Sequence, residues 1–475
     1  MTPGTSLLGW RTTPGPVAVT GSLVGALCAA AVPAFLTGAL QGRIADELGI
    51  GVAGIGVSVA AFFVAAGTTS IPAGRVVDRI GAPLALRIGM AFAATASASI
   101  AVLATTHWHL TVLLMLAGVS LALVDTGGSR ALSRAVPHGR QGVAFGVKEA
   151  SGPLASLLAG LTLPVIGAHL GWRPAFVGAA VLAAVTGFAI SSGLDRPRTS
   201  VDHPPRGGVG GGDRGADRAD VRDTPPAGAE EPRDRRTAVT SAQRRPAAPP
   251  RPTSSTTPLL ALLALAAASA GAVASSVATF LVPTGELAGL SPGNAGLVLS
   301  TASLASVAAR ILSGVAVDRR SGTELLAVAI LAGIGSLGVI GLALTGGVLA
   351  DQPGSGVLLV VAAVLALGGG WGWTGLLFLA GVRVEPRRPA LSGGVVLAGL
   401  GLGGSGGPAA FGYLAEHLGF PTTWLIAAPL MASAAVVATV LRWRIRVRDE
   451  SLEAADHQGS AGQPGPADHL GPGTG

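Results

Sequence analysis

Long apolar runs recur along the whole chain and leave little choice of fold. A helix needs about 20 apolar residues to cross roughly 30 Å of hydrocarbon, and runs of that length recur in both halves of the sequence. Only 12% of the 475 residues are charged, against about 25% in a soluble protein. The sequence therefore predicts an all-α membrane protein with twelve transmembrane helices. We place these helices near 17–40, 52–73, 84–104, 110–129, 143–166, 174–192, 258–283, 294–315, 324–346, 356–380, 391–413 and 422–441.

The two halves of the chain share a signature at the end of an apolar helix. The string Gly-x-x-x-Asp-Arg occurs at 74–79 and again at 314–319. In membranes, internal repeats of this kind are typical of alternating-access transporters. We therefore expect two related six-helix bundles, one at 17–193 and one at 258–446.

The distribution of arginine predicts how the chain is oriented. The loops after the even-numbered predicted helices hold most of the basic residues, and such loops face the cytoplasm. The chain is thus expected to be a multi-pass protein of the cell membrane with both termini cytoplasmic. Residues 194–257 are rich in Arg, Asp, Pro and Gly and have little to bury, which predicts a disordered cytoplasmic linker; a docking or regulatory role stays open. We expect 1–16 to be a cytoplasmic segment and 447–475 to be a disordered tail.

The repeated signature resembles a loop motif of the major facilitator superfamily, called motif A. The resemblance covers both halves of the chain and implies the fold of a twelve-helix secondary transporter. The strings that begin at Arg140 (Arg-Gln-Gly-Val-Ala-Phe-Gly) and at Gly171 (Gly-Trp-Arg-Pro-Ala-Phe) also resemble that superfamily. The chain departs from the motif after Gly81, where Ala82 and Pro83 stand in place of the usual basic residues.

The chemistry of the signature suggests a gating role. Glycine lets a neighbouring helix approach closely in a membrane, and an aspartate one turn further can meet the positive end of a helix in the opposite bundle. The arginine that follows can pair with acidic groups or lipid phosphates. Such contacts would hold the cytoplasmic side shut, whereas a plain loop cap would have no gating role. The candidate residues are Gly74, Asp78, Arg79, Gly314, Asp318 and Arg319.

Four charged residues stand out inside the predicted spans, where charge is costly and usually functional. They are Asp125, Lys148, Glu149 and Arg310. At a rise of roughly 1.5 Å per residue, all four lie about 7–12 Å above the inner boundary, in one layer. The fifth and eighth helices pack across the bundle interface in the superfamily that the chain resembles. Glu149 and Arg310 can therefore meet there, and Lys148 can face Asp125 or the central cavity.

Two interpretations of this layer remain open. In the first, Lys148 or Arg310 receives a substrate carboxylate, and Glu149 or Asp125 takes a proton. In the second, the four residues form structural ion pairs between helices. The residue types fit both interpretations.

Two tryptophans fall in the middle of the tenth predicted helix. The first, fourth, seventh and tenth helices line the cavity in the resembled superfamily, so Trp371 or Trp373 could stack on a substrate. Alternate residues of a helix point about 200° apart, so only one of the two is expected to face the cavity.

These features favour proton-coupled transport of a small organic anion, with export of hydrophobic drugs or metabolites as the alternative. A membrane sensor built on the same scaffold is a third class, but residues 194–257 carry no recognisable signalling domain. No metal-ligand cluster and no nucleophile–base set appears, so we expect neither an enzyme nor a cofactor. The scattered arginines form no basic patch for nucleic acid. The expected partners are a small-molecule substrate, protons and the lipid bilayer, and the chain is expected to be monomeric.

Overall fold

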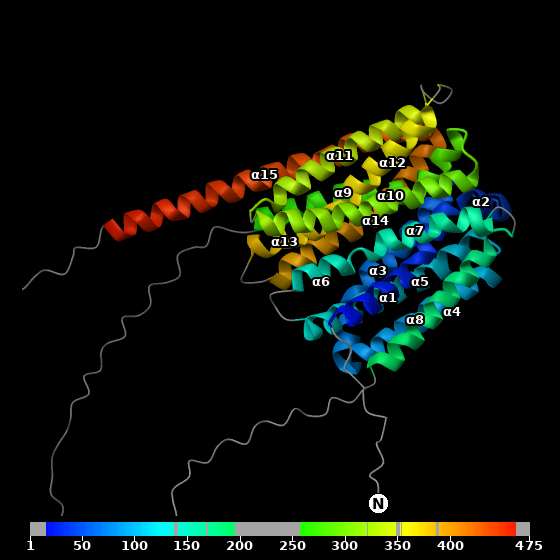
Figure 1. Cartoon of the computed structure of the whole chain (residues 1–475), viewed down its shortest axis with the longest axis horizontal. Coiled ribbons are helices and arrows are strands. Elements are labelled where there is room, and N and C mark those ends of the chain that lie inside the picture. Colours follow the sequence, from blue (N-terminus) through cyan, green and yellow to red (C-terminus); the bar gives the residue numbers. More distant parts are fainter. Residues whose placement is uncertain are drawn as a thin grey trace, which may run out of the picture. The chain divides into compact units, whose positions relative to one another are not determined.

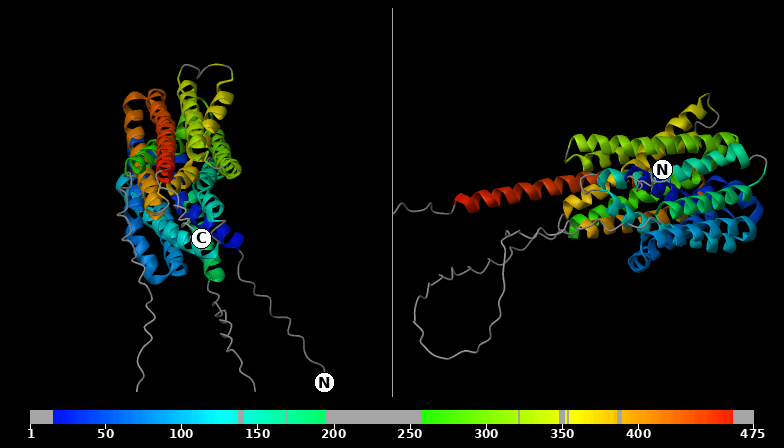
Figure 2. Two further views of the ribbon diagram at one scale, coloured as in Figure 1. Left: turned by 90° about the vertical axis from the view of Figure 1, so that its left-hand side faces the viewer. Right: turned by 60° about the horizontal axis from the view of Figure 1, so that its bottom comes forward.

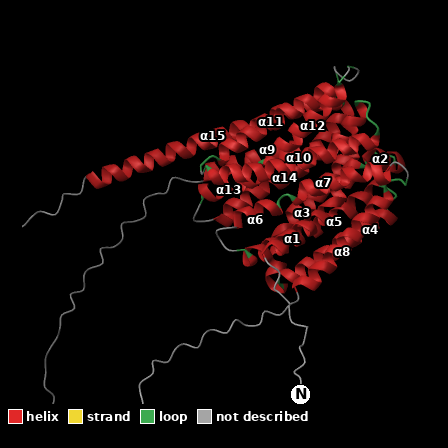
Figure 3. Cartoon of the chain, viewed as in Figure 1, coloured by secondary structure: helices red, strands yellow, loops and turns green. Residues whose placement is uncertain are grey.

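The computed structural model describes residues 16–136, 141–167, 170–194, 257–320, 322–347, 352, 354–385 and 389–461. Every regular element in this part of the chain is a helix (Figure 3), and 11 helical stretches are long and apolar enough to cross a membrane. The chain is therefore an all-α membrane protein, as the sequence predicts. The elements are α1 (Pro16–Ala39), α2 (Gln41–Leu48), α3 (Val52–Ile80), α4 (Ala82–Leu103), α5 (His107–Ala135), α6 (Gln141–Lys148), α7 (Ser151–Thr162), η2 (Leu163–Gly167), α8 (Arg173–Leu194), α9 (Thr257–Leu287), α10 (Pro292–Arg319), α11 (Glu324–Thr345), α12 (Ser355–Gly372), α13 (Thr374–Val384), α14 (Pro389–Leu418) and α15 (Phe420–Ala461).

One predicted span, the fifth at 143–166, is not among these 11 stretches. It is divided into α6, α7 and the π-helical turn η2, and prolines explain both divisions. Pro153 has no N–H to donate to the carbonyl of Glu149, four residues earlier, and the chain turns at Glu149 and Ala150. Pro164 lies within η2, where a local π adjustment satisfies the backbone groups that proline frees. Together the three pieces cover the fifth predicted span, from Gln141 to Gly167.

The helices on both sides of the linker belong to one compact unit. In this unit α1 to α8, blue to green in Figure 1, form one group, and α9 to α15, green to red, form a second (Figures 1 and 2). The pairs α3–α14 and α7–α10 make broad contacts between the groups. We call the end of the unit that holds α2 the α2 end, and the opposite end, where α3 and α10 finish, the motif end.

Glycines bring the two groups into tight contact towards the α2 end. A Cβ on Gly56 of α3 would lie 2.3 Å from the carbonyl oxygen of Pro408 in α14. A Cβ on Gly160 of α7 would lie 2.5 Å from the carbonyl oxygen of Gly296 in α10. No side chain fits at such distances, so the backbones approach as closely as small residues permit in a membrane. At Gly74, nearer the motif end of α3, a Cβ would meet no described atom within 4 Å.

A clamp of polar side chains joins α2, α4 and α8 at the α2 end. The carboxylate of Glu47 accepts hydrogen bonds from Nε1 of Trp172 and from Nη2 of Arg173, both at 2.7 Å. Arg173 also donates to the carbonyl oxygens of Ala101 and Ala104, at 2.8 and 2.9 Å. Its guanidinium lies over the ring of Trp172, 4.5 Å from the centroid. One arginine thus holds three helix ends together.

The clamp should make the stability of the protein depend on acidic pH. The hydrogen bond from Arg173 is the main cause that lowers the pKa of Glu47 below its ordinary value. A carboxyl whose pKa is lowered by folding stabilises the folded state above its ordinary pKa of about 4.3, and this contribution is lost as the pH falls through the lowered value. We expect Glu47→Gln to be less stable than the parent near neutral pH and to lose less stability on acidification. Thermal unfolding in detergent on both sides of this window checks the prediction, and equal acid sensitivity of the two proteins would contradict it.

The last helix is longer than predicted. Where a disordered tail was expected from residue 447, α15 continues to Ala461 and extends beyond the other helices (Figure 2). No proline or glycine interrupts residues 430–458, and Arg446 lies four residues before Glu450, a spacing that favours helix. The remaining residues of the predicted termini and linker, 1–15, 195–256 and 462–475, lie outside the described part.

Candidate functional site

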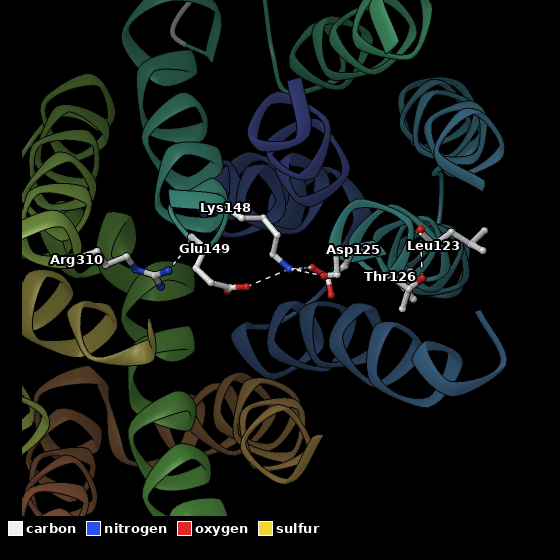
Figure 4. A network of polar contacts seen from close by, with 8 residues as sticks. Leu123, Asp125, Thr126, Lys148, Glu149 and Arg310 are labelled. Carbon is white, nitrogen blue, oxygen red and sulfur yellow. Dashed lines mark hydrogen bonds and ion pairs between the residues drawn. The ribbon is translucent and has the colours of Figure 1, made fainter. Parts of the chain in front are cut away.

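The structure brings the four predicted intramembrane charges into one row. Asp125 comes from α5, Lys148 from the end of α6, Glu149 from the turn that follows α6, and Arg310 from α10 (Figure 4). The row starts in the first group of helices and ends in the second, so it crosses the interface along which the two groups meet. The single layer predicted from helix rise is therefore present.

Lys148 lies at the centre of the row and is only 3% exposed. Its Nζ donates to Oδ1 of Asp125 at 2.6 Å and to Oγ of Ser129 at 3.0 Å. Oε1 of Glu149 lies 3.3 Å from the same nitrogen. A buried ammonium is tolerated only when it is paired and hydrogen-bonded, and these three partners match its three N–H donors.

Arg310 joins the row through the backbone carbonyl oxygen of Glu149, which Pro153 leaves free to accept its hydrogen bond. The carbonyl oxygen of Glu149 has no intrahelical donor, since Pro153 lacks the N–H four residues on. Nη1 of Arg310 donates to that oxygen. Glu149 and Arg310 thus meet across the interface, as the sequence predicts, but through the carbonyl of Glu149 in place of its carboxylate.

One of the two candidate tryptophans is next to Arg310. The guanidinium carbon of Arg310 lies 5.7 Å from the ring centroid of Trp371, and Nε1 of Trp371 donates to the carbonyl oxygen of Ala274 in α9 at 3.2 Å. Trp373 is fully buried in the apolar core, and its Nε1 has no partner among the described residues. Only Trp371 therefore belongs to the candidate site.

The predicted gating residues make different contacts from those expected. Asp78 pairs with Arg130 of α5, which lies in its own group of helices, and among the described residues it caps no helix of the opposite group. A Cβ on Gly314, as on Gly74, would meet no described atom within 4 Å. The close approach expected at both glycines is absent in this conformation, because their helix faces have no described neighbour at the motif end. The other predicted gating residues, Arg79, Asp318 and Arg319, are exposed.

A carboxylate does cap a helix of the opposite group, but it lies at the α2 end. Oε2 of Glu416 in α14 accepts a hydrogen bond from the backbone N–H of Ala53 at 2.9 Å, in the first turn of α3. A Cβ on the preceding Gly51 would lie 2.5 Å from the same oxygen. The contact places negative charge at a helix N-terminus, where it is favourable, and it lies next to the glycine contact at Gly56.

Most of the chain matches one protein family. The family model described as Major Facilitator Superfamily matches residues 22–350. The chain belongs to the Major Facilitator Superfamily. It is accordingly a multi-pass membrane protein of a transporter family and not an enzyme. No curated protein sequence matches the chain.

Solved structures with the same fold include two conformations of one superfamily transporter. They are crystal structures of a bacterial homologue of the human lysosomal transporter Spinster, inward-facing, in occupied and unoccupied forms. The TM-scores are 0.57 and 0.56, with 14% sequence identity in both cases. Each comparison covers 91% of this chain and 96% of the other. At that identity the likeness shows the superfamily fold alone.

Two polar groups of this superfamily member were missed in the sequence. Ser129 lies four residues after Asp125, on the same face of one helix, and this spacing was a signal that could have been used. Glu416 has no local signal, because its partner is the backbone of α3, 363 residues away in the sequence.

Proposed function

We propose that this superfamily member is a proton-coupled secondary transporter of a small organic anion in the cell membrane. The observation that carries the proposal is Arg310, whose Nε is buried without a partner among the described residues. The guanidinium of Arg310 contacts the ring of Trp371 and donates to the backbone carbonyl oxygen of Glu149. A planar guanidinium with a donor to spare suits a carboxylate, and an aromatic ring beside it suits an apolar body.

Lys148 and Arg310 have different neighbours, which suggests different roles for the two cations. Lys148 lies between the carboxylates of Asp125 and Glu149, so an anion would have to displace one of them to reach it. Arg310 faces a neutral carbonyl, which an anion can replace at a lower electrostatic cost. We therefore assign substrate contact to Arg310 and Trp371, and proton exchange to the carboxylates that flank Lys148.

The proposed orientation in the membrane follows from the distribution of arginine. The proposed conformation, closed on the outer side, follows from the packing between the two groups of helices. The motif end holds Arg75, Arg79, Arg319 and Arg320, and the positive-inside rule would place that end in the cytoplasm. The tight contacts at Gly56 and Glu416 would then close the outer side in this structure. The small-molecule substrate, protons and lipid are the proposed partners, and the proposed transporter works as a monomer.

Uptake into proteoliposomes tests the proposal. A panel of radiolabelled carboxylates would be offered to the parent with and without an inward proton gradient, beside Arg310→Ala. We expect gradient-driven uptake of at least one carboxylate by the parent, and a loss of at least about tenfold in the variant, because losing a charged hydrogen-bond partner weakens binding by about 1.5–3 kcal/mol. Arg446→Gln, which removes a positive charge from the exposed part of α15, controls for net charge and should match the parent.

Two results would go against this function. One is the absence of saturable carboxylate uptake by the parent under either condition. The other is efflux of a hydrophobic dye that persists in Arg310→Ala, which would make the row of charges structural and favour the exporter.

A further inference from the structure

The row of charges is electrically balanced as it stands. It holds two carboxylates, on Asp125 and Glu149, and two cations, on Lys148 and Arg310. All four lie within the membrane-spanning unit, where an uncompensated charge is costly. Any charge that enters the row must therefore be matched by a second change of charge.

The helices packed around Glu149 add no further counter-charge at this level among the described side chains. α1 has no Asp, Glu, Lys, Arg or His. On α13 the basic residue is Arg383, which forms an ion pair with Glu324. Arg130 of α5 pairs with Asp78, and the remaining described charges of α5 and α10 lie at the helix ends. On these helices, therefore, no described charge besides Lys148 and Arg310 is placed to balance Glu149.

The two carboxylates are not held equally. Asp125 lies 2.6 Å from Nζ of Lys148, whereas Glu149 lies 3.3 Å from it. Glu149 is also the residue whose backbone holds Arg310, so an anion that binds Arg310 arrives beside this carboxylate. Like charges in one site disfavour ionisation of both. Protonation of Glu149 therefore gives up a weaker ion pair than protonation of Asp125 would. It also removes the repulsion between Glu149 and an anion bound to Arg310.

We propose that the site carries a monovalent carboxylate together with one proton, in a step that moves no net charge, and that Glu149 takes the proton. This inference rests on the function proposed above and specifies its substrate class. A monoanion adds one negative charge at Arg310, and the proton on Glu149 removes one, so the row stays neutral throughout. A dicarboxylate would leave one negative charge unmatched and is excluded by the same balance.

The first experiment uses the parent protein and sets the membrane potential independently of the pH gradient. Proteoliposomes with a potassium gradient and valinomycin would take up radiolabelled benzoate, lactate and succinate. If one net charge moved with the substrate, a potential of about 100 mV would change the accumulation by up to about 50-fold. We expect benzoate or lactate accumulation to follow the proton gradient and to be unchanged by the potential, with no uptake of succinate. Accumulation that follows the potential, or a preference for succinate, would overturn the inference and leave carboxylate transport intact.

The second experiment locates the proton. Glu149→Gln should abolish accumulation driven by the proton gradient and retain exchange of labelled for unlabelled monocarboxylate, because a neutral side chain mimics the protonated state. Retained exchange also shows that the variant is folded. Glu286→Gln, which neutralises a half-buried carboxylate at the α2 end of α9, is the matched control and should accumulate substrate as the parent does.

Asp125→Asn tests which of the two carboxylates accepts the proton. If Asp125→Asn loses accumulation and keeps exchange, while Glu149→Gln still accumulates substrate, the proton belongs to Asp125 and the assignment to Glu149 is wrong. If the parent transported none of the three acids, this result would instead contradict the proposed function itself.

Discussion

Replacing Lys148 with methionine is expected to abolish proton-driven transport and to lower the stability of the protein. The substitution keeps the length of the side chain and removes the charge that Asp125 and Glu149 share. Removing one partner of a buried ion pair costs about 3–5 kcal/mol, because a charge is left uncompensated. The lower end of that range applies, since the two carboxylate side chains are 32% and 33% exposed and water screens them in part. Thermal unfolding in detergent and uptake into proteoliposomes measure the two effects.

A second variant separates loss of charge balance from loss of function. Lys148→Met combined with Asp125→Asn removes both members of the shorter ion pair, so it should recover part of the lost stability and none of the proton coupling. Arg446→Gln again serves as the control for one positive charge lost at an exposed position. Unfolding of Lys148→Met at the parent temperature would show that the lysine is not needed to balance its neighbours.

Replacing Gly56 with valine should prevent the α2 end from closing. The new Cβ would lie 2.3 Å from the carbonyl oxygen of Pro408, and neither backbone can move without separating α3 from α14. Overpacking of this kind costs about 1–3 kcal/mol, which shifts the ratio of two conformations by about 5- to 150-fold. We expect the conformation open at the α2 end to become dominant and transport to fall by a similar factor.

Distances between spin labels would show this shift directly. Labels on cysteines at Trp108 and Leu418, which are exposed at the α2 end of the two groups, would be introduced with Cys28→Ser. Their separation should increase in Gly56→Val. Gly67→Val is the matched control on the same helix, because a Cβ there would meet no described atom within 4 Å, and its distances should equal those of the parent. An unchanged distance in Gly56→Val would mean that the interface adapts to the larger residue.

The positions of the helices could be predicted because each depends on a short stretch of sequence. The length of an apolar run fixes whether it can cross the membrane, and eleven of the twelve predicted spans correspond to described helical stretches long and apolar enough to do so. The break in the fifth predicted span was not predicted, although its cause, Pro153, is visible in the sequence. The end of α15 lies beyond the predicted one, because a helix does not have to end where its apolar residues end. The helix continues through the charged residues that follow the apolar stretch and ends at Ala461.

The candidate site could be predicted only as a set of residues at one depth. Helix rise places Asp125, Lys148, Glu149 and Arg310 in a layer, since depth depends on sequence position within each span. Which atoms each charged side chain contacts depends on how the helices are rotated and how closely they approach. The sequence of a single span does not specify either. The pairing of Asp78 with Arg130 in place of a helix end shows this at the motif end.

The sequence by itself thus determined an all-α membrane protein with many spans, a repeated signature and a layer of charge, because hydrophobic length and helix rise are local properties. Only the tertiary structure decided that Lys148 holds two carboxylates and that Arg310 binds the carbonyl that Pro153 leaves free. It also decided that a carboxylate caps α3 at the α2 end. These contacts join segments far apart in the chain, and their geometry is set by packing between helices.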